Sequence, residues 1–361
     1  MGSEAGDKES SLKTAAEFSV LLPALPHPTP PRTLRQKFQF AFNPRYTNVH
    51  GVVATPEDRS RIAVLTGEFD LVWVLNSRTP NILARWRWPR AHLDIDDIPS
   101  TYLRTLAANS AGTVHRLQLR LQQQLLKRRE LRLKDRFATL SVCSQADRAY
   151  LRGGSEIHVI PNGFPRPSAP PERRLGTHGL RIGFIGLFSY APNAAGVRWF
   201  LDQCWPAILQ SIPGIRLRLI GRDSDGPLRP KDPNVDALGW VSDPGEEIAT
   251  WSAMIVPIHF GGGTRIKIAE AFSRECPAVS TSVGAFGYEV EHEKQLLMAD
   301  EPDDFAAACI RLIQNPELGQ RLASRAWKDY LEQWTWDAIA PKVWSAAEDC
   351  LRRSAGQAKR A

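Results

Sequence analysis

The sequence predicts an α/β protein with two domains, each built on a parallel β-sheet. Its 361 residues are more than twice the usual domain size of about 100 to 150 residues, so two separate hydrophobic cores are expected. Short apolar runs alternate with helical patterns in the second half of the chain, which is typical of a doubly wound parallel sheet. Residues 165–179 (PRPSAPPERRLGTHG) have the proline, charge and glycine content of an interdomain linker. The two domains are therefore expected at residues 33–164 and 180–334.

The two ends of the chain are expected to lie outside these domains. Residues 1–32 are polar at first and then rich in proline (PALPHPTPPR), and such a segment holds neither a helix nor a central strand. It is predicted to be disordered. Residues 335–361 are predicted to form a C-terminal helix that packs back on the first domain and ends in a frayed tail.

Composition restricts the class of protein. The chain is 43% hydrophobic and 24% charged, and its net charge of +7 suits nucleic acid, an anionic membrane surface or a phosphorylated substrate. No apolar stretch reaches the roughly 18 residues of a membrane span, and the polar start is unlike a signal peptide. The five cysteines form no CxxC pair, which indicates reduced thiols. A cytoplasmic protein is expected, and nucleic-acid binding is disfavoured because the basic residues cluster without interleaved aromatic residues.

The first domain is predicted to contain four buried strands. Each is a short apolar run that ends in polar residues, and the last is stopped by the Pro-Asn-Gly turn at residues 161–163. The runs are residues 69–75 (FDLVWVL), 91–95 (AHLDI), 138–143 (ATLSVC) and 157–160 (IHVI).

A long helix is predicted between the second and third of these strands, over residues 101–135. Its later part, residues 116–136, carries eight Lys or Arg residues against two acidic residues. Such a segment is either the solvated face of a basic protein or a surface that contacts anionic lipid on the inner face of a membrane. The pattern leaves both interpretations open.

The second domain is predicted to alternate strands and helices throughout, as a parallel sheet with crossover helices requires. The expected strands are residues 181–186, 217–221, 237–240, 253–259, 277–281 and 295–298. The expected helices are residues 194–210, 244–251, 264–274 and several from 302 onward.

The segment HFGGGTRIKIAEA, residues 259–271, is the most informative of the predicted strand-to-helix loops. Ligands of open parallel sheets bind at the carboxyl ends of the strands, and glycines at this point let a backbone approach a ligand closely. The free N–H groups of the following helix favour an anion, so the segment predicts a diphosphate site. Arg265 and Lys267 supply positive charge, and the carboxylate of Glu270 is suited to a pair of hydroxyls such as those of ribose.

Three further loops of the second domain are candidates for the same site. Gly186 ends the first strand of this domain, and Asn193 is either an N-cap of the following helix or a ligand contact. Arg222 ends the next strand, where a guanidinium either contacts the ligand or is solvated. The segment STSVGAFGYE, residues 280–289, is either a simple turn or a fourth contact.

The acidic segment AHLDIDDIPS, residues 91–100, is the unusual feature of the first domain. Asp94, Asp96 and Asp97 crowd the end of a predicted strand, where like charges raise one another's pKa. The cluster suits a base, a metal site or a clamp for an acceptor hydroxyl, while a helix cap by Asp97 is the simpler interpretation. His92 is interpreted as a packed histidine.

Residues 137–337 resemble the donor half of glycosyltransferase family 4, the retaining group 1 glycosyltransferases of the GT-B fold. The resemblance rests on motifs in family order and spacing: SVCSQADRAYL, VIPNGF, FIGLFSYAPNAAGVRWFLDQCWPAI, LIG, LGWV, VPIHFGGGTRIKIAEAF, PAVSTSVGAFGYE and WTWD. It implies two Rossmann-like domains that face each other across a cleft, with the nucleotide bound mainly by the second domain and the acceptor entering from the first.

The resemblance also implies roles for individual residues. Glu270 matches the glutamate that binds the donor ribose in the family, Arg265 and Lys267 compensate phosphate charge, and Gly262, Gly263 and Thr264 offer backbone donors. Many members carry an earlier glutamate that contacts the sugar, and this chain has Gly262 at that position, which leaves sugar recognition to backbone groups. The nucleotide diphosphate sugar is the substrate, and no cofactor or metal is required.

The first domain departs from the family pattern because no glycine-rich loop precedes the run at residues 69–75, and only some 35 residues separate that run from the proline segment. A reduced acceptor domain is expected. The family's acceptor-side catalytic region follows the strand matched by AHLDIDD, so Asp94 and Asp97 are the candidate catalytic residues there. The acceptor is expected to be a glycan or a lipid-linked glycan. A catalytically silent nucleotide-sugar-binding protein and a GT-B sugar-nucleotide epimerase are the alternatives.

Overall fold

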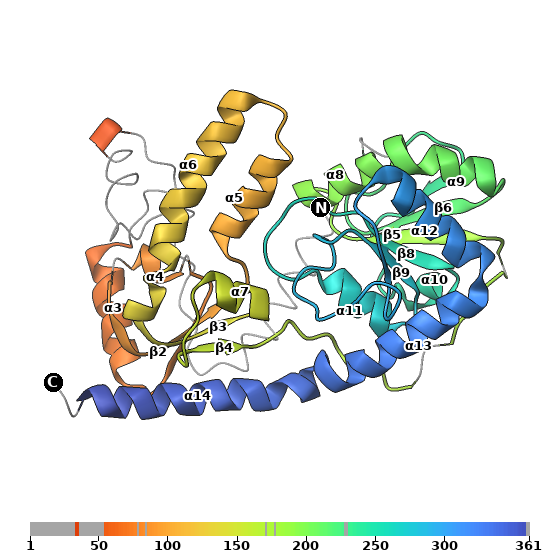
Figure 1. Cartoon of the computed structure of the whole chain (residues 1–361). Helices are drawn as coiled ribbons and strands as arrows, with labels where there is room; N and C mark the ends of the chain where they lie inside the picture. Colours follow the sequence, from red (N-terminus) through yellow and green to blue (C-terminus); the bar gives the residue numbers. More distant parts are fainter. Residues whose placement is uncertain are drawn as a thin grey trace.

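The computed structural model describes residues 33–35 and 54–358, with gaps at residues 78, 84, 170–171, 177 and 227–229. The predicted disordered segment 1–32 and residues 359–361 of the predicted tail lie outside the described residues. The described chain contains two parallel β-sheets, one of four strands and one of six, each with its own hydrophobic core (Figure 1).

The first sheet has the strand order β1-β2-β3-β4, with every pair parallel. Its strands lie within a few residues of the predicted runs, because each run is a buried apolar segment bounded by polar residues. The strands are β1 (Val72–Leu75), β2 (Trp88–Ile95), β3 (Phe137–Val142) and β4 (Ile157–Val159). Within the described part of the chain, this sheet has four strands and the second has six.

The prediction of a single helix over residues 101–135 is wrong. The structure has α5 (Pro99–Ala108) and α6 (Thr113–Glu130), which lie side by side and project away from the sheet, followed by the short η1 (Leu133–Asp135) (Figure 1). Residues 109–112 form the connection, where Asn109 ends α5 and Gly112 begins α6. Asn and Gly disfavour a helix interior, which explains the break. The other helices of this part are α3 (Pro56–Gly67), α4 (Thr79–Ile82) and α7 (Gln145–Tyr150).

The second sheet has the strand order β10-β9-β8-β5-β6-β7, a doubly wound topology. The chain runs from β5 outward through β6 to β7, and then continues on the other side of β5 through β8 to β10. Loops after β5 and β8 therefore diverge at the switch point of the sheet, where open α/β sheets bind ligands. The strands are β5 (Arg181–Ile185), β6 (Arg216–Ile220), β7 (Val235–Ala237), β8 (Ala253–Val256), β9 (Ala278–Ser280) and β10 (Leu297–Met298).

The helix predicted over residues 194–210 begins earlier and is interrupted. It consists of α8 (Ala191–Trp199), a π-helical turn η2 (Phe200–Cys204) and α9 (Trp205–Ser211), whose first turn contains a proline that lacks an N–H group. The remaining helices are α10 (Gly245–Ala249), α11 (Ile266–Ser273), α12 (Pro302–Gln314) and α13 (Pro316–Gln333). All five cysteines are buried free thiols.

The C-terminal helix α14 (Trp336–Ala358) leaves the second domain and runs along the first sheet, as expected (Figure 1). Ile339 and Ala346 of this helix are buried against Ile160, and Trp73 packs on the same cluster. The hydroxyl of Ser354 donates a hydrogen bond of 3.0 Å to the carbonyl of Pro89. The helix thus joins the two domains on the side away from the projecting α5 and α6.

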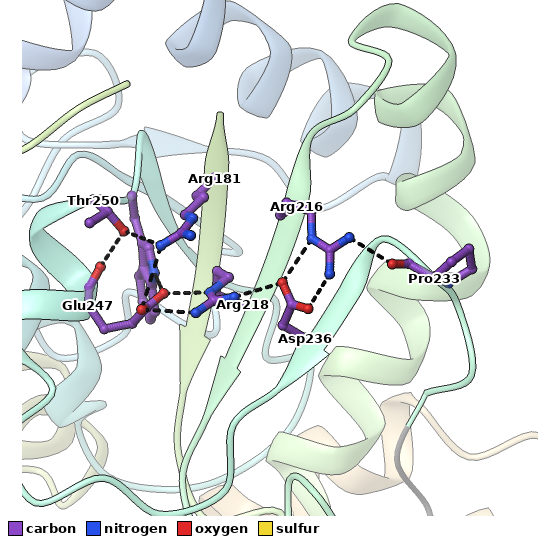
Figure 2. A network of polar contacts seen from close by, with 8 residues as sticks. Arg181, Arg216, Arg218, Pro233, Asp236, Glu247 and Thr250 are labelled. Atoms are coloured by element: carbon purple, nitrogen blue, oxygen red, sulfur yellow. Dashed lines mark hydrogen bonds and ion pairs between the residues drawn. The ribbon is translucent and has the colours of Figure 1, made fainter. Parts of the chain in front are cut away.

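A ladder of arginines and carboxylates stabilises the amino-terminal half of the second sheet (Figure 2). Arg216 donates to Asp236 at 2.9 Å, and Arg218 donates both to Asp236 at 2.7 Å and to Glu247 at 2.6 Å. Hydrogen bonds from Arg216 hold the pKa of the Asp236 carboxyl below its ordinary value. Because Arg181 and Arg216 begin their strands, this network lies at the opposite end of the sheet from the glycine-rich turn and ties β5, β6, β7 and α10 together.

Candidate functional site

The glycine-rich turn connects β8 to α11 at the switch point of the second sheet. Strand β8 ends three residues earlier than predicted, and α11 begins at Ile266 rather than at residue 264. Gly261 and Gly263 have φ angles of +142° and +64°, a region that residues with side chains rarely adopt. The glycines are therefore required by the path of the chain, and α11 directs its N-terminus toward the turn.

Arg265 binds the backbone of the glycine-rich turn and does not extend into solvent. Its side chain is 8% exposed, and its Nη1 donates to the carbonyls of Gly262 and Gly263, the latter at 2.8 Å. Burial lowers the pKa of Arg265, although its guanidinium is expected to remain charged at neutral pH. Through these hydrogen bonds Arg265 fixes the backbone geometry of the turn. It also places a positive charge next to the turn.

Lys267, Gly186 and Asn193 lie together beside the turn, as the sequence predicts for three parts of one site. A Cβ atom built on Gly186 would lie 2.8 Å from Nδ2 of Asn193 and 3.0 Å from Nζ of Lys267. The ammonium group also lies 5.2 Å from the ring centre of Phe184. Burial and the neighbouring Arg265 lower the pKa of Lys267 to about 8. A cation of this kind, poorly solvated and close to a glycine, is suited to an anionic ligand.

Asn193 is not the N-cap that the simpler interpretation suggested. Helix α8 begins at Ala191, so Asn193 lies in its first turn, and its Nδ2 donates to the carbonyl of Leu187 at 2.8 Å. This bond holds the loop after β5 against the helix. Arg222 is exposed at the end of β6, and its carbonyl accepts a hydrogen bond of 3.0 Å from the N–H of Phe188 in the same loop.

Glu270 lies on α11 one turn after Lys267 and is half-buried. Burial raises the pKa of the Glu270 carboxyl above its ordinary value. The positive charges of Arg274 and Lys267 offset part of this increase. A partly desolvated carboxylate between two cations is an effective acceptor for hydroxyl donors. Glu270 is therefore farther from the glycine-rich turn along α11 than Lys267 is.

The first domain supplies the opposite wall of the site through Asp96 and Asp97. A Cβ atom built on Gly262 would overlap with the carboxylate of Asp97. Asn162, which follows β4, donates from Nδ2 to Oδ1 of Asp96 at 2.6 Å and to Oγ1 of Thr264 at 2.9 Å. Asp97 is therefore brought to the turn. It does not cap α5, because the N-cap is Ile98.

Asp94 is placed differently from Asp97. Its carboxylate accepts a hydrogen bond of 2.6 Å from the hydroxyl of Ser141, inside the first sheet. That hydroxyl also lies 2.9 Å from Nε2 of His92, whose Nδ1 contacts Thr139 at 2.8 Å. Burial lowers the pKa of His92 to about 3, so it is neutral and acts as a packed histidine. Asp94 belongs to this buried network, and the structure does not bring it to the turn in the way it brings Asp97.

Helix α5 contributes contacts that sequence reasoning did not find. The hydroxyl of Thr105 accepts a hydrogen bond of 3.0 Å from the N–H of Gly261 and lies 3.2 Å from its carbonyl. Asn109 donates from Nδ2 to the carbonyl of His259 at 2.9 Å, and Tyr102 packs edge-on against Phe260. These partners are about 150 residues apart in the chain, and no local pattern relates them. Asn162, which also contacts the turn from the first domain and was not predicted as a site residue, does lie in a motif of the resemblance, VIPNGF.

For the nucleotide-sugar donor that the resemblance implies, replacing Thr105 with valine is expected to reduce kcat/KM roughly tenfold. Valine keeps the shape but removes the hydroxyl that bonds Gly261, and one or two such bonds are worth about 0.5–1.5 kcal/mol each. Steady-state kinetics on the purified variants measures the effect. Thr105→Ser keeps the hydroxyl and is expected to retain near wild-type activity; equal activity of the valine and serine variants would contradict this positioning role.

The geometry defines a class of protein: two parallel α/β sheets with a glycine-rich turn, a half-buried lysine and a carboxylate from the opposite domain at the switch point. This is the GT-B fold. Residues 179–315 match the family model described as "Glycosyl transferases group 1". This match covers less than half of the chain and agrees with the resemblance to group 1 glycosyltransferases found in the sequence.

Comparisons with individual proteins agree at the level of the fold. A glycosyltransferase from Rickettsia africae has a TM-score of 0.59 at 10% identity, over 95% of this chain and 87% of its own. The Anabaena protein Alr3699/HepE, solved in complex with UDP-glucose, has a TM-score of 0.56 at 16% identity, over 80% of each chain. An uncharacterised 44.6 kDa protein of the cps region of Klebsiella pneumoniae is 24% identical over 152 residues. That stretch covers only 39% of this chain and 39% of the Klebsiella protein.

Proposed function

We propose that the protein transfers a sugar from a nucleotide diphosphate sugar to a hydroxyl of a glycan or lipid-linked glycan, with retention of anomeric configuration. The observation that carries the proposal is the convergence of Lys267, Gly186 and Asn193 at the switch point, next to a glycine-rich turn that the first domain also contacts. An anionic donor and an acceptor from the other domain fit this arrangement.

The diphosphate is proposed to bind at the start of α11. Backbone N–H groups of Gly262, Gly263 and Thr264 are offered as donors, and the charges of Arg265 and Lys267 compensate the phosphates. These groups are fixed before the reaction begins, so they stabilise the negative charge that develops on the departing diphosphate. Glu270 is proposed to bind the two ribose hydroxyls.

The acceptor hydroxyl loses its proton in the proposed transfer, and two groups are candidates to accept it: the departing diphosphate and Asp97. In a front-side reaction the acceptor oxygen bonds to the anomeric carbon on the face from which the diphosphate departs, which accounts for retention. The departing diphosphate takes the acceptor proton itself, so no protein base is required. Asp97 is the carboxylate best placed to assist, since it contacts the turn, whereas Asp94 is bound to Ser141. A metal is not part of this proposal.

Peripheral contact with an anionic membrane is proposed for α6, with a revised range. The helix ends at Glu130, so residues 131–136 of the predicted basic helix 116–136 lie in a turn and η1. Val114, Leu117 and Leu121 are exposed on α6 among basic residues, an arrangement that suits the interface of an anionic bilayer. None of the helices described is both long and apolar enough to cross a bilayer. Co-sedimentation with phosphatidylglycerol vesicles, but not with phosphatidylcholine vesicles, is the expected result.

Turnover of nucleotide sugars by the purified chain tests the proposed function. UDP-sugars are tested first, because the Anabaena protein was solved with UDP-glucose, and GDP-sugars follow. Glu270→Ala is expected to lower kcat/KM roughly 10- to 100-fold, the value of hydrogen bonds to a charged group, and the exposed Glu317→Gln serves as control. The anomeric configuration of the product, followed by NMR, reports retention or inversion.

The alternatives predict different results in the same experiment. Nucleotide binding without turnover of any donor, with or without glycan acceptors, would favour a silent binding protein. Conversion of the donor to an isomeric sugar without an acceptor would favour an epimerase. Binding of neither nucleotide would exclude the proposed function.

A further inference from the structure

A buried glutamate of α6 caps the first turn of α5. The N-cap residue of α5 is Ile98, whose side chain offers no acceptor to the free N–H groups of that turn. The carboxylate of Glu130, the last residue of α6, accepts a hydrogen bond of 2.9 Å from the N–H of Ser100 and a second one from the Ser100 hydroxyl. Glu130 is 7% exposed, and Ser100 is fully buried. An acceptor at this position stabilises the start of a helix and fixes its first turn.

Helix α7 is joined to the same point through Tyr150. The hydroxyl groups of Ser100 and Tyr150 lie 2.8 Å apart. The ammonium group of Lys127 lies 4.6 Å from the centre of the Tyr150 ring, and the guanidinium of Arg104 lies 5.4 Å from it. Ser100 is therefore the point at which α5, α6 and α7 are held together, and a buried polar network of this kind holds its members rigidly.

Ser100 lies between the two parts of the first domain that contact the glycine-rich turn. Asp97, which precedes it in the loop after β2, has its carboxylate where a Cβ atom on Gly262 would lie. Thr105, which follows it on α5, accepts a hydrogen bond of 3.0 Å from the N–H of Gly261. An α-helix rises about 1.5 Å per residue, so Thr105 is only about 8 Å along the axis from Ser100. A displacement of Ser100 is therefore transmitted to both contacts.

We infer that Glu130 is a positioning residue for the proposed transfer: it holds the loop of Asp97 and helix α5 in place against the glycine-rich turn. Its effect on the reaction rests on the proposed function, and it acts through these two contacts without touching the donor. Burial raises the pKa of Glu130 to about 7, so the carboxyl and carboxylate forms are both present at neutral pH. Both forms keep an oxygen that accepts from the N–H of Ser100. The role therefore depends on hydrogen bonding, and glutamine is expected to fulfil it.

Hydrogen–deuterium exchange of the full chain, without ligand, tests the positioning itself. Glu130→Met keeps the length of the side chain and removes both acceptors, so backbone amides of α5 and of residues 259–265 are expected to exchange at least roughly tenfold faster. Glu130→Gln is the matched variant and is expected to stay within roughly threefold of the wild type. Strand β9, in the core of the second sheet, is expected to be unchanged in both.

Turnover of a UDP- or GDP-sugar is the second readout. Glu130→Met is expected to lower kcat roughly 10- to 100-fold, because a displacement of about 1 Å in a reacting site costs this much. Its affinity for UDP or GDP alone is expected to change less than about threefold, since Lys267, Gly186 and Asn193 belong to the second domain. Adding Thr105→Val to Glu130→Met is expected to cost less than about threefold more, because both changes disrupt one contact.

The two readouts separate failure of this inference from failure of the proposed function. Unchanged exchange in residues 259–265 of Glu130→Met, or a double variant whose two losses add in full, would overturn the inference while the proposed function stands. Equal acceleration in β9 would identify Glu130 as a general support of the fold and would also overturn it. A wild type that turns over no nucleotide sugar would contradict the proposed function, whereas the exchange experiment would still decide whether Glu130 positions the turn.

Discussion

Replacing Lys267 with methionine is expected to weaken binding of the nucleoside diphosphate roughly 100-fold. The ammonium group lies in a partly desolvated position beside Gly186, where a charged hydrogen bond to phosphate is worth up to about 3 kcal/mol. Methionine keeps most of the aliphatic length, so the packing against Phe184 is largely retained. Titration calorimetry with UDP and GDP measures the change, and Lys342→Met on the exposed face of α14 is the matched control.

The pH dependence of binding provides an independent check on Lys267. Burial and Arg265 lower its pKa to about 8, so in the free protein the ammonium form predominates at pH 7 and is in the minority at pH 9. Because the diphosphate binds the charged form, affinity is expected to decrease as the pH rises through 8. Lys267→Met is expected to lose this dependence. A wild-type affinity that is constant from pH 7 to 9 would contradict the assigned role.

Replacing Gly262 with alanine is expected to lower kcat/KM roughly 100-fold and to weaken nucleotide binding roughly tenfold. The added methyl group would overlap with the Asp97 carboxylate, so the turn or the acidic loop must shift, and shifts of about 1 Å cost this much in catalysis. Unlike Gly261 and Gly263, this glycine is not among the residues with positive φ, so its backbone conformation is not the obstacle.

The double variant Gly262→Ala with Asp97→Gly tests that explanation. Removing the carboxylate leaves space for the methyl group, so nucleotide affinity is expected to return to within roughly threefold of the wild type. Calorimetry with UDP and GDP is the readout, because Asp97 is also proposed to assist the acceptor proton and activity would therefore not report on the turn alone. A double variant as defective in nucleotide binding as Gly262→Ala would show that the obstacle lies within the turn itself.

The sequence by itself determined the two parallel sheets, the place of the glycine-rich turn and the resemblance of the second domain to group 1 glycosyltransferases. These features depend on local patterns: buried strands are continuous apolar runs, and a turn with positive φ needs glycine, as at residues 261 and 263. The clustering of Gly186, Asn193 and Lys267 also followed, because loops at the carboxyl ends of neighbouring parallel strands meet at one edge of the sheet.

Only the tertiary structure decided how the two domains meet at that edge. Thr105 and Gly261, 156 residues apart, and Asp97 and Gly262, farther still, are joined by the packing of one domain on the other, which no local periodicity encodes. Arg265 was expected to compensate phosphate charge, and the structure adds that its guanidinium donates to the carbonyls of its own turn. Asp94 and Asp97 belong to the same acidic segment, but Asp94 bonds Ser141 and Asp97 contacts the turn, because Asp94 is still within β2 and Asp97 lies in the loop after the strand.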